Sequence, residues 1–188
     1  QNINFIDNEL MVGAGTDMDT LLNFCGSAGL SGLEWAGGLP GTLGGAIRGN
    51  AGAFQGEIKD VIKEVAALDI SKNKPKLVVY KNKGCRFSYR DSVFKKAKGK
   101  LIILQAVLNL KKGRGPQIKD EIEARIKYRK ERHPLEYPNI GSIFKNVDLK
   151  LVPKKIIPRI KAAVKTDPFP VVPTAFLVSE AGLKAVAS

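Results

Sequence analysis

The chain has 188 residues, which is enough for one large domain or two small ones. Its longest apolar runs, such as residues 101–104, are far too short to cross a bilayer, and its two isolated cysteines form neither a disulfide framework nor a metal site. We therefore expect a protein of the reducing cytoplasm. The net charge of +13 indicates an anionic partner, either a nucleic acid or a phosphorylated small molecule, unless it serves only solubility.

The first half of the chain mixes strands with one clear helix. Short strands are predicted at residues 2–6 and 9–14. Asp17 can cap a helix whose apolar residues fall on one face from Met18 to Ala28, and Gly29 can end it. A glycine-dense stretch at 32–56 follows, and residues 61–70, 77–80 and 101–110 then favour strands.

The second half begins with a basic, glycine-containing linker at residues 111–115. Pro116 suits the first turn of a helix whose isoleucines recur every four residues, and this helix should end before His133. Two more helices are predicted at 154–165 and 174–181, with Gly182 as the C-terminal cap. This order predicts an α+β protein with a boundary near Gly113, and hence domains at residues 1–113 and 114–188.

The most informative motif is the glycine-rich run from Gly37 to Ala46, which continues to Gly52. Glycine lets the backbone adopt positive φ and lets a ligand approach closely, so consecutive N–H groups can bind a phosphate, more so if a helix begins at Thr42. The run matches neither a GxGxxG fingerprint nor a P-loop, because no lysine follows its glycines. The alternative is a tight loop that serves packing alone.

Arg90 lies in a second motif, between aromatic residues and beside Asp91 and Ser92. A guanidinium held in such surroundings can bind a carboxylate through two parallel hydrogen bonds. The alternative is an arginine at the end of a strand, paired with Asp91.

A third motif runs from Tyr137 to Asn146 and contains Ser142. Its serine, Lys145 and Asn146 can present a hydroxyl, a cation and an amide to one ligand. His133 is the only histidine in the chain and is not placed as a base for the serine, so a hydrolase triad is improbable. The alternative is a polar surface loop.

Together the three motifs resemble those of one enzyme family. Residues 39–46 with 50–53 are similar to the flavin diphosphate loop of the UDP-N-acetylenolpyruvoylglucosamine reductases. Residues 89–94 resemble that family's catalytic arginine segment, and residues 134–146 its catalytic serine segment. Residues 180–184 are similar to the family's late helix. The order and spacing agree over nearly the whole chain.

The resemblance implies a flavoenzyme of peptidoglycan synthesis that uses NADPH and FAD to reduce UDP-N-acetylglucosamine enolpyruvate to UDP-N-acetylmuramate. The implied fold is an FAD-binding domain of the vanillyl-alcohol-oxidase-like class, followed by a smaller α+β substrate-binding domain. We expect a cytoplasmic monomer that binds no nucleic acid, membrane or metal.

The resemblance also assigns residues. Arg90 would stabilise negative charge that develops on the substrate, and Ser142 would donate the proton. Tyr89, Lys145 and Asn146 are expected to bind substrate. The residues expected to bind FAD are Leu39, Pro40, Gly41, Thr42, Gly44, Gly45, Arg48, Asn50 and Gly52. The family uses one more basic residue before the serine segment, and spacing does not choose among Arg125, Arg129 and Arg132.

Two departures from the family pattern are visible. Residues 1–15 do not match the family's first flavin loop, and no counterpart of its late catalytic glutamate is found. We therefore expect these 188 residues to bind FAD weakly and to be inactive when isolated.

Two other functions compete with the reductase. A nucleic-acid-binding module would fit the charge, but aromatic residues make up only 7% of the chain and are scattered rather than interleaved with basic residues. A flavin oxidase would fit the glycine loop but has no use for a proton donor.

Overall fold

The computed structural model describes residues 3–6, 9–132, 144–167 and 169–183. The chain divides into two compact units, Gln1–His133 and Pro134–Ser188. The architecture mixes strands and helices in both units, as the α+β prediction requires.

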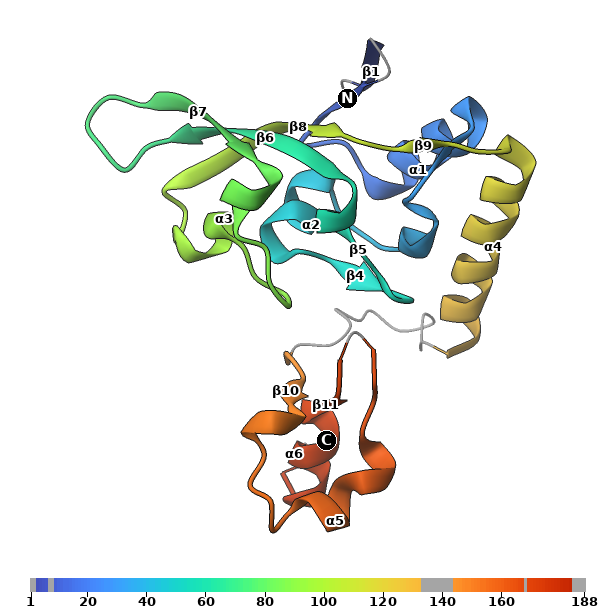
Figure 1. Ribbon diagram of the computed structural model, residues 1–188, viewed down its shortest axis with the longest axis vertical. Helices are drawn as coiled ribbons and strands as arrows, with labels where there is room; N and C mark the ends of the chain where they lie inside the picture. Colours follow the sequence, from blue (N-terminus) through green and yellow to red (C-terminus); the bar gives the residue numbers. More distant parts are fainter. Residues whose placement is uncertain (1–2, 7–8, 133–143, 168, 184–188) are drawn as a thin grey trace, which may run out of the picture. The chain divides into compact units, whose positions relative to one another are not determined.

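A five-stranded antiparallel sheet forms one side of the first unit (Figure 1), in the order β1-β2-β8-β6-β7. The strands are β1 (Ile3–Ile6), β2 (Glu9–Gly13), β8 (Leu101–Leu108), β6 (Ile62–Asp69) and β7 (Lys76–Lys81). Alternate side chains of a strand point to opposite faces. The core face buries Val12, Val65 and Leu108 completely, whereas the other face leaves Leu77 and Ile102 exposed.

The helices of this unit pack around the core face. They are α1 (Met18–Ala28), η1 (Glu34–Ala36), α2 (Leu43–Gly49), η2 (Ile58–Asp60), η3 (Asn82–Cys85), α3 (Val93–Lys96) and α4 (Gly115–Arg132). The predicted helix α1 is confirmed: it buries one apolar face and ends at Gly29, which adopts a φ of +65°. Figure 1 shows α2 and α3 below the sheet and α4 beside α1.

Two short strand pairs shape the glycine-rich region. β4 (Gly52–Ala53) and β5 (Gly56–Glu57) form a tight hairpin, and β3 (Leu30–Ser31) pairs with β9 (Lys111–Lys112). The turn of the hairpin places Phe54 and Gln55 at positive φ, a conformation that side chains other than glycine rarely adopt. The hairpin was not predicted separately, because its turn lacks the glycine or asparagine that normally marks one.

The second unit contains smaller elements. They are β10 (Val147–Asp148), η4 (Leu149–Leu151), α5 (Ile157–Ile160), η5 (Lys161–Ala163), β11 (Val171–Val172) and α6 (Thr174–Glu180). β10 and β11 pair antiparallel, and both strand residues of β11 are fully buried. The helix predicted at 174–181 is confirmed, with Gly182 at positive φ just after it.

Two expectations from the sequence differ from the structure. The helix predicted at 154–165 is wrong in extent, since the α-helix comprises only residues 157–160. Pro158 explains this, because within a longer helix its ring would clash with the carbonyl of Lys154. The division between the units also falls after residue 133 rather than near Gly113, because α4 packs on α1 and η1. Among the described helices, none is long and apolar enough to span a membrane.

Candidate functional site

The glycine-rich loop is anchored to the segment that follows β2. Thr42 caps α2, and its side-chain oxygen accepts a hydrogen bond from the Gly45 amide at 3.3 Å. The Leu43 amide donates to the Thr16 carbonyl at 2.9 Å, and the Gly44 amide donates to the Ala14 carbonyl at 2.8 Å. The predicted helix start at Thr42 is therefore present, but these three amides of its first turn already have partners within the chain.

The glycines of this loop divide into packed and open positions. A Cβ added at Gly44 would lie 2.9 Å from the Ala14 Cβ, so this glycine is needed for packing. Gly41 is exposed at a φ of +100°, and a Cβ there would meet no atom within 4 Å. A Cβ at Gly45 would meet only the Thr42 hydroxyl, at 3.7 Å. Gly41 and Gly45 are thus two positions where another molecule can approach the backbone.

Asn50 ends α2 and is completely buried. It adopts the left-handed conformation, with a φ of +43°, which asparagine tolerates better than most residues. Its side-chain amide donates to Glu57 Oε1 at 3.2 Å and to the Ser88 carbonyl at 3.0 Å, and its Oδ1 accepts from the Lys59 amide at 3.2 Å. One side chain thereby joins the end of α2, the β5–η2 segment and the loop that carries Arg90.

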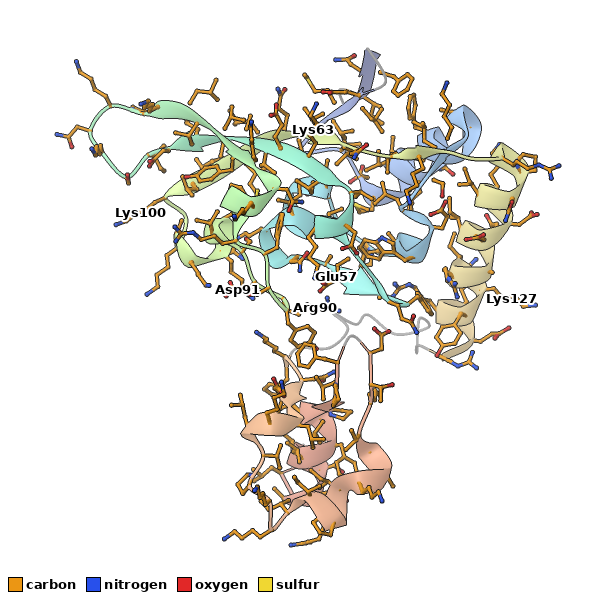
Figure 2. The ribbon with its side chains drawn as sticks, in the orientation of Figure 1. Glu57, Lys63, Arg90, Asp91, Lys100 and Lys127 are labelled. Atoms are coloured by element: carbon orange, nitrogen blue, oxygen red, sulfur yellow. The ribbon has the colours of Figure 1, made fainter. Side chains whose placement is uncertain are left out.

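Arg90 lies in a tight turn that Ser88 and Asp91 close by exchanging two backbone hydrogen bonds of 3.0 Å. Its φ is +55°. Its guanidinium donates from Nη1 to the Asn50 carbonyl at 3.3 Å and from Nη2 to the Gly52 carbonyl, and lies 5.2 Å from the centre of the Tyr89 ring. In Figure 2, Arg90 and Glu57 lie close to the β4–β5 hairpin.

Arg90 is not paired with the neighbouring carboxylate. Asp91 forms its ion pair with Lys96, at 3.3 Å, and accepts a hydrogen bond from the Ser92 amide. Desolvation acts to raise the pKa of Asp91, but the Ser92 hydrogen bond and the lysines outweigh it, and the pKa lies below its ordinary value. Among the described residues no carboxylate lies within ion-pair distance of Arg90. The alternative that Arg90 pairs with Asp91 is therefore wrong, since Asp91 pairs with Lys96.

The three candidate arginines of α4 differ in their surroundings. Arg129 donates from Nε to the Gly37 carbonyl at 2.8 Å, while its Nη2 is buried with no partner among the described residues. Arg125 lies 4.6 Å from the centre of the Phe54 ring, and its buried Nε likewise has no such partner. Arg132 stacks on Tyr128 at the exposed end of the helix. Burial lowers the pKa of Arg129 from its ordinary value.

The remaining predicted residues are placed as follows. Leu39 packs on the core, Pro40 and Arg48 are exposed, and a Cβ at Gly52 would lie 2.7 Å from the Gly56 carbonyl oxygen. Lys145 and Asn146 belong to the second unit, where the Lys145 carbonyl accepts from the Thr174 hydroxyl at 2.6 Å. Ser142 lies outside the described residues.

Sequence reasoning missed Glu57, which accepts a hydrogen bond from the side-chain amide of Asn50. Its side chain is mostly buried, accepts from Asn50 and forms an ion pair with Lys59. No local sequence signal marks Glu57, because the turn of the β4–β5 hairpin that positions it lacks the residues that normally mark a hairpin.

Comparison with known proteins identifies the relatives of this chain. This chain is 39% identical over 145 residues to the UDP-N-acetylenolpyruvoylglucosamine reductase of Syntrophomonas wolfei. The alignment covers 77% of this chain and 47% of that protein. The reductase of Fervidobacterium nodosum is 44% identical over 75% of this chain and 44% of its own length. The chain belongs to the UDP-N-acetylenolpyruvoylglucosamine reductase family. It spans about half the length of the curated relatives it matches.

The fold is also that of a UDP-N-acetylenolpyruvoylglucosamine reductase. The crystal structure of the Thermus caldophilus enzyme superposes with a TM-score of 0.61, covering 93% of this chain and 68% of the other, at 24% sequence identity. No protein-family model matches the chain.

Proposed function

We propose that the protein reduces UDP-N-acetylglucosamine enolpyruvate to UDP-N-acetylmuramate in peptidoglycan synthesis, with FAD as cofactor and NADPH as hydride source. The first unit would be an FAD-binding domain of the vanillyl-alcohol-oxidase-like class, and the second would bind substrate. We expect a cytoplasmic monomer. The names of its relatives support the substrate class, because each of them is a reductase of this UDP-sugar.

The observation that carries the proposal is the environment of Arg90. Two backbone carbonyls orient its guanidinium, and among the described residues no carboxylate neutralises it. A half-buried cation held by neutral acceptors retains its charge for a ligand, and its remaining N–H groups can bind a carboxylate. The enolpyruvyl group of the proposed substrate carries such a carboxylate.

The end of the glycine-rich loop and the first turn of α2 have open positions that suit a flavin diphosphate. Gly41 and Gly45 leave room for close approach, and the exposed Arg48 lies on the last turn of the same helix. Gly44, by contrast, would serve the fold rather than the cofactor. Its amide donates to the Ala14 carbonyl, and its Cα lies too close to Ala14 for a side chain. When bound, FAD supplies the ability to accept a hydride from NADPH and pass it to a carbon atom.

Among the arginines of α4 we propose Arg129 as the basic residue that assists this site. Its Nε bond to Gly37 holds it against the start of the glycine-rich run, and its buried Nη2 still lacks an acceptor among the described residues. A buried donor without a partner is costly, so an anionic or carbonyl group of a ligand would satisfy it.

The chemistry assigned to the chain is charge stabilisation and proton transfer. When a hydride adds to the β-carbon of the enolpyruvyl group, negative charge develops toward the carboxylate, where Arg90 would stabilise it. Ser142 would then give its proton to the α-carbon, completing the lactyl ether. Lys145, Asn146 and Tyr89 would bind other parts of the substrate.

The test is Arg90→Lys in the flavin-loaded protein expressed from the whole natural reading frame. Lysine keeps the charge but loses the planar fork, so turnover of the enolpyruvyl substrate should fall by about 100-fold or more. Arg86→Lys is the matched control, because Arg86 is an exposed arginine at positive φ in the same loop. Turnover of Arg90→Lys within about twofold of the parent would contradict the proposal.

A further inference from the structure

Asn50 contacts the Arg90 turn twice, through two different groups. Its side-chain amide donates to the Ser88 carbonyl, two residues before Arg90, and its own carbonyl accepts from Arg90 Nη1. The left-handed backbone of Asn50 at the end of α2 sets the direction of this carbonyl. The amide is also held from the other side by Glu57.

We propose that Asn50 and Glu57 are positioning residues, which hold the guanidinium of Arg90 in the orientation that binds the substrate carboxylate. This inference rests on the proposed function of Arg90. It assigns Asn50 to the substrate side of the reaction, whereas the family resemblance led us to expect a contact with FAD.

The hydrogen bonds of Asn50 leave its side chain little capacity for a cofactor. Both known acceptors of its amide and the one donor to its Oδ1 belong to the protein, and the residue is completely buried. Both N–H groups of this enclosed amide are thus used within the protein, so its role is to fix the backbone around it rather than to donate to a ligand.

Asparagine is the residue type that this position demands. Glycine would tolerate the positive φ but offers no donor for Ser88 or Glu57. Aspartate would tolerate the backbone but would place a second carboxylate against Glu57 and lose both donors. Gly52 is constrained as well, since a Cβ there would lie 3.1 Å from Arg90 Nη1.

Glu57 accepts the second hydrogen bond of the Asn50 side-chain amide. Its carboxylate accepts from Asn50 through Oε1 and pairs with Lys59 through Oε2, while its backbone amide donates to Asp60 at 2.9 Å. Lys59 and Asp60 thus hold Glu57 where its Oε1 accepts from Asn50, and a continuous series of contacts runs from Glu57 through Asn50 to Arg90. A glutamine here would keep the acceptor, whereas an alanine would remove it.

The first experiment measures binding to the flavin-loaded protein from the whole natural reading frame. UDP-N-acetylmuramate carries a lactyl carboxylate, and UDP-N-acetylglucosamine does not. The ratio of their affinities therefore measures how much the carboxylate contributes to binding. Asn50→Gly should lower the affinity for the first by about tenfold, the loss expected for one misplaced charged contact, and leave the second unchanged. Flavin content and flavin reduction by NADPH should stay at the parent values.

The control is Asn82→Gly. Asn82 also donates its amide to two carbonyls, those of Lys59 and Ile62, but neither belongs to the Arg90 turn. This variant should lose a similar amount of stability without changing the ratio of affinities. If Asn50→Gly does not fold, Glu57→Ala takes its place, and Glu57→Gln should restore the parent ratio.

A double-mutant cycle separates the possible outcomes. In the Arg90→Lys background, Asn50→Gly should have no further effect on the ratio, because its action passes through Arg90. Equal loss for both ligands, additivity with Arg90→Lys, or an effect matched by Asn82→Gly would overturn the inference. An unchanged ratio in Arg90→Lys alone would instead refute the role of Arg90, and the positioning role with it.

Discussion

Arg90 combines backbone strain with a half-buried charge that no described carboxylate neutralises. A residue other than glycine at a φ of +55° costs about 1–2 kcal/mol in conformational free energy, so surrounding contacts must hold the backbone of Arg90 there. They come from both sides of the turn: Lys95 donates to the Arg90 carbonyl at 2.9 Å, and the guanidinium donates to the carbonyls of Asn50 and Gly52. Strain that is held this firmly is typical of residues whose orientation serves a ligand.

The two thiols provide a test of burial at single residues. Burial, with a smaller contribution from Glu34, raises the pKa of Cys25 from 9.0 to about 12, and burial raises that of Cys85 to about 11. Above pH 9.0 the unfolded chain ionises its thiols while the folded chain keeps them protonated, so the folded state binds more protons. The free energy of unfolding should therefore fall as pH rises, by up to about 1.4 kcal/mol per pH unit for each thiol.

Urea unfolding of the parent and of Cys25→Ala between pH 9 and 11 measures this effect. Other groups also titrate there, so the difference in slope between the two proteins isolates Cys25. Identical slopes would show that Cys25 ionises as readily in the folded protein as in the unfolded chain.

Among the elements, α2 carries two neighbouring glycines with different surroundings. Gly44 packs against Ala14, and Gly45 is open. Gly45→Ala adds a methyl group in open space and removes a flexible residue from a helix, so stability should rise by about 0.5–1 kcal/mol. The same change should weaken FAD binding if the flavin approaches Gly45. Gly44→Ala should instead destabilise the fold by about 1–3 kcal/mol, because the new methyl group meets Ala14.

Thermal unfolding and flavin titration of both variants check this prediction. Full FAD affinity in Gly45→Ala would remove Gly45 from the cofactor site, and unchanged stability in Gly44→Ala would contradict the packing against Ala14.

The elements that sequence periodicity predicts are those governed by local patterns. β6 follows the alternation of its side chains, and α1 lies between the Asp17 and Gly29 signals. Pattern reasoning overestimated the helix at Pro158, since the apolar spacing continued where the proline ring does not allow a helix. The contacts of Asn50 with Glu57 and Ser88 join residues up to 38 positions apart, and no local pattern encodes such contacts.

For the molecule as a whole, the sequence gives a net charge of +13. Figure 2 shows Lys63, Lys100 and Lys127 at the periphery of the first unit, on β6, before β8 and on α4. The rings of Phe54 and Tyr128, and those of Tyr80 and Phe94, pack against each other in T-shaped pairs. These four rings contact each other, and the expectation that the protein binds no nucleic acid stays a prediction.

We propose that the protein passes reducing equivalents from NADPH to an enolpyruvyl UDP-sugar. The most direct test is anaerobic rapid mixing of the NADPH-reduced, flavin-loaded protein from the whole natural reading frame with UDP-N-acetylglucosamine enolpyruvate. We predict that the bound flavin is reoxidised at a rate sufficient for turnover and that UDP-N-acetylmuramate forms in equal amount. UDP-N-acetylglucosamine, which lacks the enolpyruvyl group, should leave the flavin reduced. Flavin that stays reduced with the enolpyruvyl substrate, or is reoxidised equally with both sugars, would contradict the assignment.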